Sequence, residues 1–197
     1  TARSNPASYV GAFDEVRRLF ANVPLALERS YSAGTFSFNA GDGRCPTCGG
    51  SGFEHVEMQF LSDVYLRCPD CDGRRYRPEI LEVKMARGDG PAKSIADVLD
   101  MTVSEAAVFF ADDRDVLDRI EPLAAVGLEY LRLGQPVPTL SGGEAQRLKL
   151  AGHLAENRGP ENRGHSPFSN SGKRRMSPIS RAPAFLFLFD EPTTGLH

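Results

Sequence analysis

The chain has 197 residues, 41% of them hydrophobic, and a formal net charge of −3. This length allows one or two domains with a buried core, and the charge argues against a general binder of polyanions while leaving room for a local one. There is no apolar run of about 18 residues and no signal-peptide pattern in residues 1–30, so we expect a cytoplasmic protein with no membrane partner. Because residue 1 is not Met, we also expect a fragment of a longer chain.

Two segments near the start carry regular hydrophobic spacing. Residues 10–21 repeat apolar side chains at helical intervals, which predicts an amphipathic helix. The side chains on its apolar face are Val10, Phe13, Val16, Leu19 and Phe20. Residues 35–39 alternate polar and apolar side chains, and this pattern predicts a strand.

All four cysteines lie in two C-x-x-C pairs, Cys45 with Cys48 and Cys68 with Cys71. Nineteen residues separate the pairs, which is within the spacing of structural zinc sites. Four thiolates bind zinc tetrahedrally and leave no position open for a substrate, so we predict structural rather than catalytic zinc. Two disulfides are the alternative, and a cytoplasmic location disfavours them. His55 is a further candidate ligand, although a solvated histidine is the simpler interpretation.

The stretch between and after the cysteine pairs favours β structure. Residues 53–67 are rich in Val, Phe, Tyr and Met and predict a two-stranded hairpin with its turn at or near residues 61–63. Residues 80–83 predict a further strand that leaves this module. Residues 88–94 combine Gly, Lys and Ser as a phosphate loop does, but they lack the glycine directly before the lysine, so we predict a turn.

Helices are predicted after residue 100. The T-x-x-E sequence at residues 102–105 has the spacing of a capping box and predicts a helix that ends at about Phe110. Residues 116–126 predict another helix, and residues 127–134 predict a connection. Two prolines then restrict the backbone before the next motif.

Residues 140–147 read Leu-Ser-Gly-Gly-Glu-Ala-Gln-Arg, and their spacing predicts a second capping box at the start of a helix from about residue 143 to residue 155. The two glycines leave the first turn without Cβ atoms, and unpaired N–H groups at a helix N-terminus attract phosphate. We therefore predict a nucleotide-phosphate site. Its residues are Leu140, Ser141, Gly142, Gly143 and Glu144. An ordinary capped helix is the alternative, and five fixed letters in order argue against it.

Residues 184–189 are six consecutive apolar residues, which predict a buried strand of a parallel sheet. This strand ends in Asp190 and Glu191, at the edge where ligands of such sheets bind. We predict that Asp190 holds Mg²⁺ near the phosphates, and that Glu191 is the catalytic residue that acts as general base or positions the attacking water. An acidic turn after a core strand is the alternative, and the upstream Leu140–Glu144 motif argues against it.

Residues 157–182 separate these two motifs and differ from the rest of the chain. They are rich in Asn, Gly, Pro, Ser and Arg, and they carry six basic residues and one Glu, or +5. Such a composition predicts a disordered insertion, and a long surface loop costs little closure entropy. We expect a passive linker, with a nucleic-acid tether as the alternative.

The motifs at residues 140–147 and 184–193 together resemble those of the ATP-binding-cassette (ABC) ATPases. Transporters of that superfamily usually continue with a Ser-Ala-Leu-Asp type of sequence, whereas residues 194–197 here read Thr-Gly-Leu-His. That variant is typical of the UvrA family, the damage-recognition subunits of the bacterial excinuclease. The chain is similar to the second ATPase half of that family, from just past the Q-loop to the D-loop.

The resemblance covers nearly the whole chain except residues 157–182. Further segments that fall where the family has them are residues 3–6, 36–39, 44–45, 57–58, 60–61, 63–65 and 73–76. The resemblance implies an α/β fold in which an ABC-type ATPase core fragment, a P-loop-like sheet with helices, carries an inserted α+β signature domain with a four-cysteine zinc module. The implied divisions are a signature-domain segment (1–43), the zinc module with its hairpin (44–78), the helical remainder of the signature domain (79–139) and the ATPase core segment (140–197).

The same resemblance implies ATP-dependent recognition of damaged DNA in nucleotide excision repair, within the SOS response. In this superfamily the signature motif acts in trans, on ATP held by the Walker A motif of the other half. The chain has no Walker A motif, so we expect ATP hydrolysis by the full-length protein and an inactive isolated fragment. The implied cofactors are structural Zn²⁺, ATP and Mg²⁺, and the implied partners are damaged double-stranded DNA, a UvrB-type protein bound outside this chain, and a second copy in a homodimer.

In that family the zinc-bearing insertion helps to contact DNA. The resemblance therefore implies five DNA-binding candidates, Arg44, Arg67, Arg74, Arg75 and Arg77. Charge by itself does not predict this contact, because five acidic residues between positions 44 and 77 balance the five arginines.

Two other functions remain open at this point. The first is a relative with the same ATPase core that serves drug self-resistance. A preference for lesion-bearing over intact duplex would distinguish a repair protein from such a relative. Repeated C-x-x-C-x-G units also occur in DnaJ-type chaperones, which bind unfolded chains and hydrolyse nothing. Four such units are usual there, whereas two are present here, and the motif at residues 140–144 has no place in that scheme.

Overall fold

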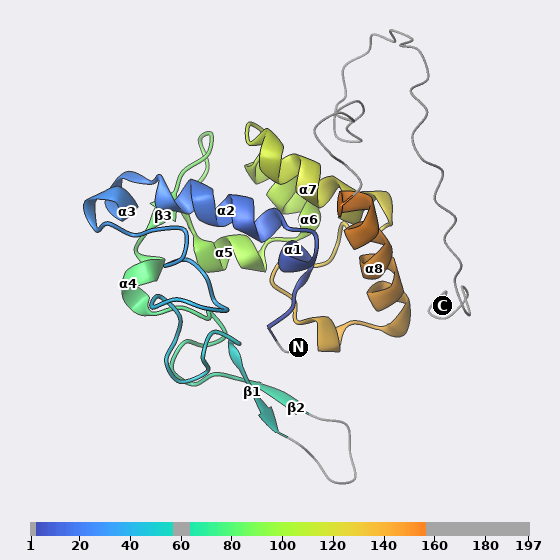
Figure 1. Ribbon diagram of the computed structural model, residues 1–197, viewed down its shortest axis with the longest axis horizontal. Coiled ribbons are helices and arrows are strands. Elements are labelled where there is room, and N and C mark those ends of the chain that lie inside the picture. The colour runs from blue at the N-terminus through green and yellow to red at the C-terminus, as the bar shows by residue number, and fades with distance from the viewer. Residues whose placement is uncertain (1–2, 57–63, 157–197) are drawn as a thin grey trace, which may run out of the picture.

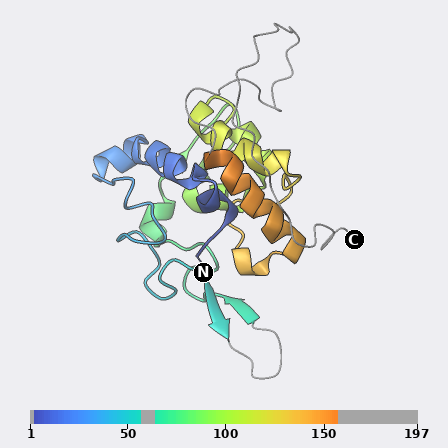
Figure 2. The ribbon, with the colours of Figure 1, turned by 45° about the vertical axis from the view of Figure 1, so that its right-hand side comes forward.

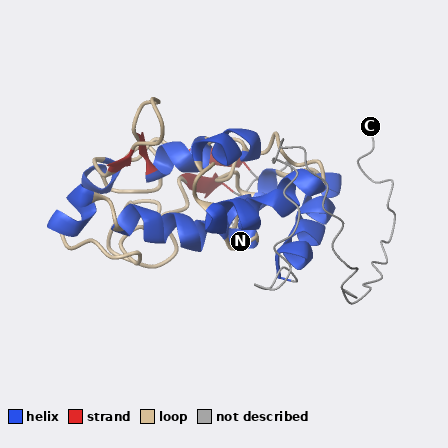
Figure 3. Ribbon diagram, turned by 90° about the horizontal axis from the view of Figure 1, so that it is seen from above, coloured by secondary structure: helices blue, strands red, loops and turns tan. Residues whose placement is uncertain are grey.

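The computed structural model describes residues 3–56 and 64–156. Figure 1 shows the helices gathered in one body, with the β1–β2 hairpin projecting from it, and Figure 3 shows from above that this body is elongated. The helices are α1 (Pro6–Tyr9), α2 (Ala12–Ala21), α3 (Pro24–Glu28), α4 (Pro78–Leu81), α5 (Ile95–Asp100), α6 (Val103–Phe109), α7 (Arg114–Ala125) and α8 (Gly142–Glu156), with a short 3-10 turn at Val137–Thr139. The strands are β1 (Phe53–Val56), β2 (Val64–Arg67), β3 (Lys84–Met85) and β4 (Lys93–Ser94).

The predicted helix at residues 10–21 is confirmed as α2, which begins two residues later at Ala12. Gly11 precedes it with a φ of +75°, a left-handed conformation that separates α2 from the short helix α1. The predicted apolar face is also confirmed, because Phe13, Val16 and Phe20 are buried in the main core. Helix α2 packs on α7, and α7 in turn packs on α8, so the core joins both ends of the described chain.

The strand predicted at residues 35–39 is wrong, because this segment is a loop. Its backbone N–H groups form turns, in which Thr35 donates to the Ser32 carbonyl at 3.0 Å and Ser37 to the Gly34 carbonyl at 3.0 Å. The alternation is still meaningful, since Phe36 and Phe38 are completely buried. Two aromatic anchors give the same sequence pattern as a strand face, and the pattern contains no information about a pairing partner.

The strand predicted at residues 80–83 is also wrong, because Pro78–Leu81 forms the helix α4. Pro78 occupies the first turn, where its missing N–H is not needed and its fixed φ suits a helix. By contrast, the turn predicted at residues 88–94 is confirmed in part: residues 88–90 turn between the antiparallel strands β3 and β4, whereas Lys93 and Ser94 form β4 itself. The described sheets each have two strands, and the predicted parallel strand at residues 184–189 lies outside the described residues.

Capping chemistry places the later helices where the sequence predicts them. Thr102 accepts a hydrogen bond from the Glu105 N–H, and the Glu105 carboxylate accepts one from the Thr102 N–H, which completes the predicted capping box of α6. Helix α7 covers the predicted residues 116–126 except the last, with Ile120 and Leu123 fully buried. None of the described helices combines the length and the apolar character needed to cross a membrane.

We expect Phe36→Ala to lower the free energy of unfolding by about 3–5 kcal/mol, because it deletes a fully buried ring and leaves a cavity. Urea denaturation followed by circular dichroism measures this change. Val108→Ala is the control, since the Val108 side chain is 78% exposed and its loss should cost within about 0.5 kcal/mol. Equal losses in both variants would contradict the role of residues 35–39 as a core anchor.

Candidate functional site

Two backbone segments far apart in sequence are paired at the base of the hairpin. Cys45 donates its N–H to the Arg75 carbonyl at 2.8 Å, and Arg77 donates to the Gly43 carbonyl at 3.0 Å. Arg44 and Tyr76 form an isolated antiparallel bridge between these two hydrogen bonds. We call the unit closed in this way, residues 43–77, the thiol module. The pairing holds the two cysteine pairs at a common centre.

The predicted hairpin is confirmed within the thiol module. Strands β1 and β2 pair antiparallel, with Phe53 opposite Arg67 and Val56 opposite Val64. The predicted turn at residues 61–63 lies outside the described residues. Gly50 has a φ of +88°, and a Cβ atom there would lie 2.0 Å from the Phe38 carbonyl oxygen, so only glycine allows the loop after the first cysteine pair to pass the core loop.

The four cysteine Sγ atoms lie within 4.8 Å of one another and form no disulfide. The Sγ atoms of Cys45 and Cys68 are 4.0 Å apart, and those of Cys48 and Cys71 are 3.7 Å apart. Zinc bound to four sulfurs at about 2.3 Å would place them about 3.8 Å apart, so the cluster fits a tetrahedral metal ion. Two backbone N–H groups, those of Gly52 and Arg75, donate to the sulfurs of Cys48 and Cys71 and would orient them as ligands.

Burial raises the pKa of the Cys71 thiol to about 12, against the opposing effect of the hydrogen bond from the Arg75 N–H. Without a metal ion this group is therefore a neutral thiol at pH 7. A metal ion binds the thiolate, so it must displace the proton.

We expect one zinc ion per chain, and we expect the zinc affinity to rise with pH because binding releases thiol protons. Competition with a chromophoric chelator between about pH 6 and pH 8 measures this dependence. Cys71→Ser should weaken zinc binding strongly, whereas Ser51→Ala, in the same module but without a metal-ligating atom, should retain it. A zinc-free protein with oxidised cysteines would contradict the assignment.

The second candidate site is the turn Leu140–Glu144, which we call the signature turn. The Ser141 N–H donates to Glu144 Oε2 at 2.8 Å, and the Glu144 N–H donates to Ser141 Oγ at 3.3 Å, which confirms the predicted capping box. Helix α8 begins at Gly142, one residue before the predicted start, and ends at Glu156, one residue beyond the predicted end. The local sequence therefore determines how this helix starts.

Ser141 and Gly142 are exposed, so the signature turn is open to solvent. The N–H groups of Gly142 and Gly143 have no hydrogen-bond partner within the described part of the chain, while the Glu144 N–H is held by Ser141. Because Ser141 Oγ accepts that hydrogen bond, its own proton stays available. The turn thus presents the Gly142 N–H and the Ser141 hydroxyl at the positive end of the α8 dipole, with Gly143 buried behind them, and exposed donors at a helix N-terminus suit phosphate oxygens.

Two side chains that the sequence analysis did not select support the signature turn. The Tyr130 hydroxyl donates to Glu144 Oε1 at 2.8 Å, and Arg147 Nη2 donates to the same hydroxyl at 3.3 Å. Arg147 also donates through Nη1 to the Gly127 carbonyl at 3.2 Å, which ties α8 to the loop before it. Tyr130 lies fourteen residues before Glu144, and no local spacing rule could have identified the contact.

The environment of Glu144 keeps its carboxylate charged. Its pKa lies below the ordinary value, first because the Ser141 N–H donates to it and further because the Tyr130 hydroxyl does. Partial burial acts in the opposite direction. The charged carboxylate therefore holds the turn, and the Gly142 N–H and the Ser141 hydroxyl remain as the exposed hydrogen-bond donors of the turn.

We expect Tyr130→Phe to raise the pKa of Glu144 towards its ordinary value, because the variant removes one hydrogen bond that favours the carboxylate. Amide exchange at Ser141 should become faster, since its acceptor is less firmly held. Carboxyl-resolved NMR titration and hydrogen exchange measure the two effects. Tyr9→Phe is the matched control, as an exposed tyrosine with no such contact, and an unchanged Glu144 pKa in Tyr130→Phe would contradict the network.

The remaining predicted site residues have separate outcomes. Asp190 and Glu191 lie outside the described residues, so their predicted roles stay predictions. The side chains of Arg67, Arg74 and Arg77 are 72%, 50% and 46% exposed, and each pairs with a nearby carboxylate. Arg44 is half-buried and donates to the Asn39 carbonyl at 3.1 Å. These four arginines remain candidates for contact with DNA.

Arg75 differs from the other four because it is only 3% exposed. Its Nη2 donates to the Gly134 carbonyl at 2.7 Å, and its guanidinium lies over the Phe38 ring, 5.0 Å from the centroid. Burial lowers its pKa. Arg75 therefore joins the thiol module to the segment before the signature turn, and a direct DNA contact does not fit this position.

No family model matches the chain. The chain is 49% identical over all 197 residues to UvrABC system protein A from Thermus thermophilus and 47% identical to the protein of the same name from Methanothermobacter thermautotrophicus. It spans 18% of the length of each of these curated relatives. The crystal structure of UvrA2 from Deinococcus radiodurans is similar with a TM-score of 0.72 and 55% identity, over 80% of this chain and 19% of that one.

The structural match and the four-cysteine cluster define the chain as a mixed helix-and-strand segment of an α/β protein that carries a candidate zinc module, and they confirm the predicted fold class. The whole-chain identities to proteins called UvrABC system protein A then specify the relationship. The chain belongs, as a segment, to the UvrA family, as its motifs predict.

Proposed function

We propose that the chain is part of the ATPase subunit that recognises damaged DNA in nucleotide excision repair. The observation that carries this proposal is the exposed signature turn with its unpartnered N–H groups, found in a chain that is similar throughout to UvrABC system protein A. The similarity favours neither a chaperone-type zinc module nor a drug self-resistance protein.

The signature turn would bind the terminal phosphates of ATP held by the Walker A motif of another nucleotide-binding half. The Ser141 hydroxyl and the Gly142 N–H are the exposed donors available for this contact. Leu140 is partly buried against the main core and anchors the turn. ATP bound between two halves favours the closed arrangement over the open one, so binding and hydrolysis would shift the protein between the two.

Asp190 and Glu191 would complete hydrolysis at the nucleotide site of their own half. Asp190 would hold Mg²⁺ beside the phosphates, and Glu191 would activate or position the attacking water. These roles rest on the sequence motif and on the relationship to UvrA. ATP hydrolysis is therefore assigned to the whole protein rather than to this segment.

The thiol module would contribute the contact with DNA. Its four thiolates would hold a structural zinc ion and stabilise the base of the projecting hairpin, visible at the bottom of Figure 2. The DNA backbone phosphates would be bound by the four arginines with accessible side chains, which are Arg44, Arg67, Arg74 and Arg77. We further infer a cytoplasmic homodimer that acts with a UvrB-type partner, from the relationship to UvrA.

Ser141→Ala in the whole protein tests the nucleotide role. We expect ATP turnover to fall by about 100-fold, the size of effect seen when a donor to a reacting oxygen is removed. Zinc content should not change. The ratio of affinities for lesion-bearing and intact duplex, measured with and without ATP, should lose its dependence on ATP.

Thr102→Ala is the matched control, because it removes an equivalent N-cap from α6 and costs a similar stability of about 1 kcal/mol. It should keep full ATP turnover, since α6 is not part of the signature turn. If both variants turn over ATP equally well, the signature turn does not contact the nucleotide. If the unmodified protein does not distinguish damaged from intact duplex, the assignment to DNA repair fails.

A further inference from the structure

A cavity of about 420 Å³ lies where the thiol module meets the segment that leads to the signature turn. We call it the junction cavity. The thiol module contributes Arg67, Arg74 and Arg75 to its lining. The segment that leads to the signature turn contributes Arg132 and Gly134. Asp100 is the one carboxylate among the described residues of its lining. Four guanidinium groups therefore outnumber the acidic groups, which favours an anionic ligand.

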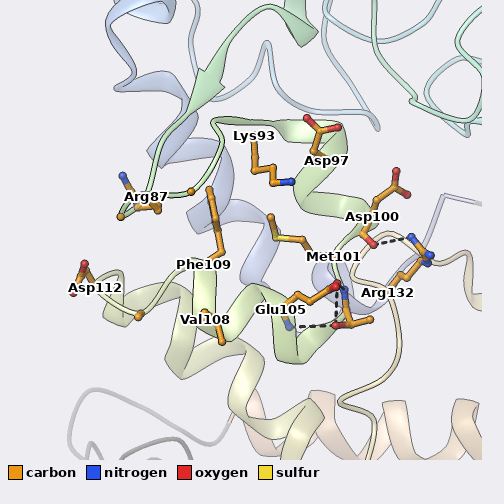
Figure 4. A pocket seen from close by; sticks show the side chains of 14 residues that line it. Arg87, Lys93, Asp97, Asp100, Met101, Glu105, Val108, Phe109, Asp112 and Arg132 are labelled. Atoms are coloured by element: carbon orange, nitrogen blue, oxygen red, sulfur yellow. Dashed lines mark hydrogen bonds between the residues drawn. The ribbon is translucent and has the colours of Figure 1, made fainter.

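A neighbouring cavity lacks this excess of positive charge. The neighbour has a volume of about 800 Å³ and shares Arg132 and Asp100 with the junction cavity (Figure 4). Its lining holds three cationic residues and four carboxylates, which balance closely. It also contains exposed apolar side chains such as Val108. The charges of the neighbouring cavity therefore do not favour an anion, whereas those of the junction cavity do.

The arginines of the junction cavity are incompletely neutralised. Arg132 donates through Nη1 to the backbone carbonyl of Asp100 at 2.9 Å and has no ion pair with any described residue (Figure 4). Arg74 pairs with Asp97 at 3.2 Å, and Arg67 pairs with Asp72 at 3.6 Å between two highly exposed side chains. Exposed pairs of this kind are weak, and each guanidinium has five N–H donors, so donors remain for a further acceptor.

The buried Arg75 adds a fixed cation at the inner wall. Its Nη2 is bound to the Gly134 carbonyl, while its Nη1 has no hydrogen-bond partner among the described residues. A buried guanidinium with an unused donor is costly, and a negative charge in the adjacent cavity would stabilise it across a short distance.

We propose that the junction cavity binds one phosphoryl group, held mainly by Arg74 from the thiol module and Arg132 from the segment before the signature turn. Guanidinium groups match the geometry of phosphate oxygens, and two of them on separate elements would be bridged by one ligand. Because Gly134 is six residues before Leu140, such a ligand would connect the thiol module with the start of the signature turn. The phosphoryl group comes either from a DNA backbone or from a free phosphate compound, and only the DNA source rests on the proposed function.

The double variant R74Q/R132Q in the whole protein tests the site with two probes. Inorganic phosphate, followed by titration calorimetry, should bind at least about tenfold more weakly if the pocket holds a free phosphate compound. Duplex DNA, titrated at several salt concentrations, should show a slope of log affinity against log salt reduced by about 0.9 if the pocket holds a backbone phosphate. Either result supports the site, and together they identify the source.

The double variant R18Q/R114Q is the matched control, because it also removes two arginines with exposed side chains but lies outside the cavity. Equal phosphate affinities and equal salt slopes in the two double variants would overturn the proposal. A protein that binds no DNA at all would contradict the proposed function, while the phosphate titration would still decide whether the cavity binds a phosphoryl group.

Discussion

The arrangement of this segment depends on the antiparallel pairing of residues 43–45 with residues 75–77. Two backbone hydrogen bonds close a loop of the chain at that point and bring the two cysteine pairs together. The same pairing determines where β1 and β2 leave the body, so the hairpin projects from a fixed base. It also directs Arg75 inward, where its guanidinium reaches the carbonyl of Gly134. A metal ion bound by the four sulfurs would reinforce a connection that the backbone already makes.

The segment 127–134, which Arg75 contacts, also holds the signature turn. The Gly134 carbonyl accepts a hydrogen bond from Arg75, and the Gly127 carbonyl accepts one from Arg147. The Tyr130 hydroxyl donates to the Glu144 carboxylate. Residues 127–134 thus contact the thiol module at one end and helix α8 at the other. A displacement of the thiol module would be transmitted to the first turn of α8 through hydrogen bonds rather than through a flexible linker. This continuity gives the proposed link between DNA contact and nucleotide binding a physical basis.

Charge in the thiol module illustrates why position matters more than composition. Five acidic residues balance five arginines between positions 44 and 77, so the sequence shows no basic patch. Folding separates these groups: it buries Arg75 and leaves three arginines in weak exposed pairs. It also brings Arg132 from a distant segment to the cavity that Arg67 and Arg74 line. The resulting local excess of positive charge is a property of the fold. It arises without any change in the net charge of the chain.

Patterns in the sequence were enough to predict the capping boxes at Thr102 and Ser141, the amphipathic helix α2, the pairing of β1 with β2 and the family relationship carried by the motifs. The capping boxes and α2 follow from contacts within a few residues, which spacing records directly, and the hairpin follows from two neighbouring β-prone runs. The folded structure was needed to show that residues 35–39 form an aromatic anchor, that residues 80–83 do not form a strand, that Arg75 is buried and that Tyr130 supports Glu144. Those outcomes depend on partners far away in the chain, and a local pattern contains no information about which distant group will be adjacent after folding.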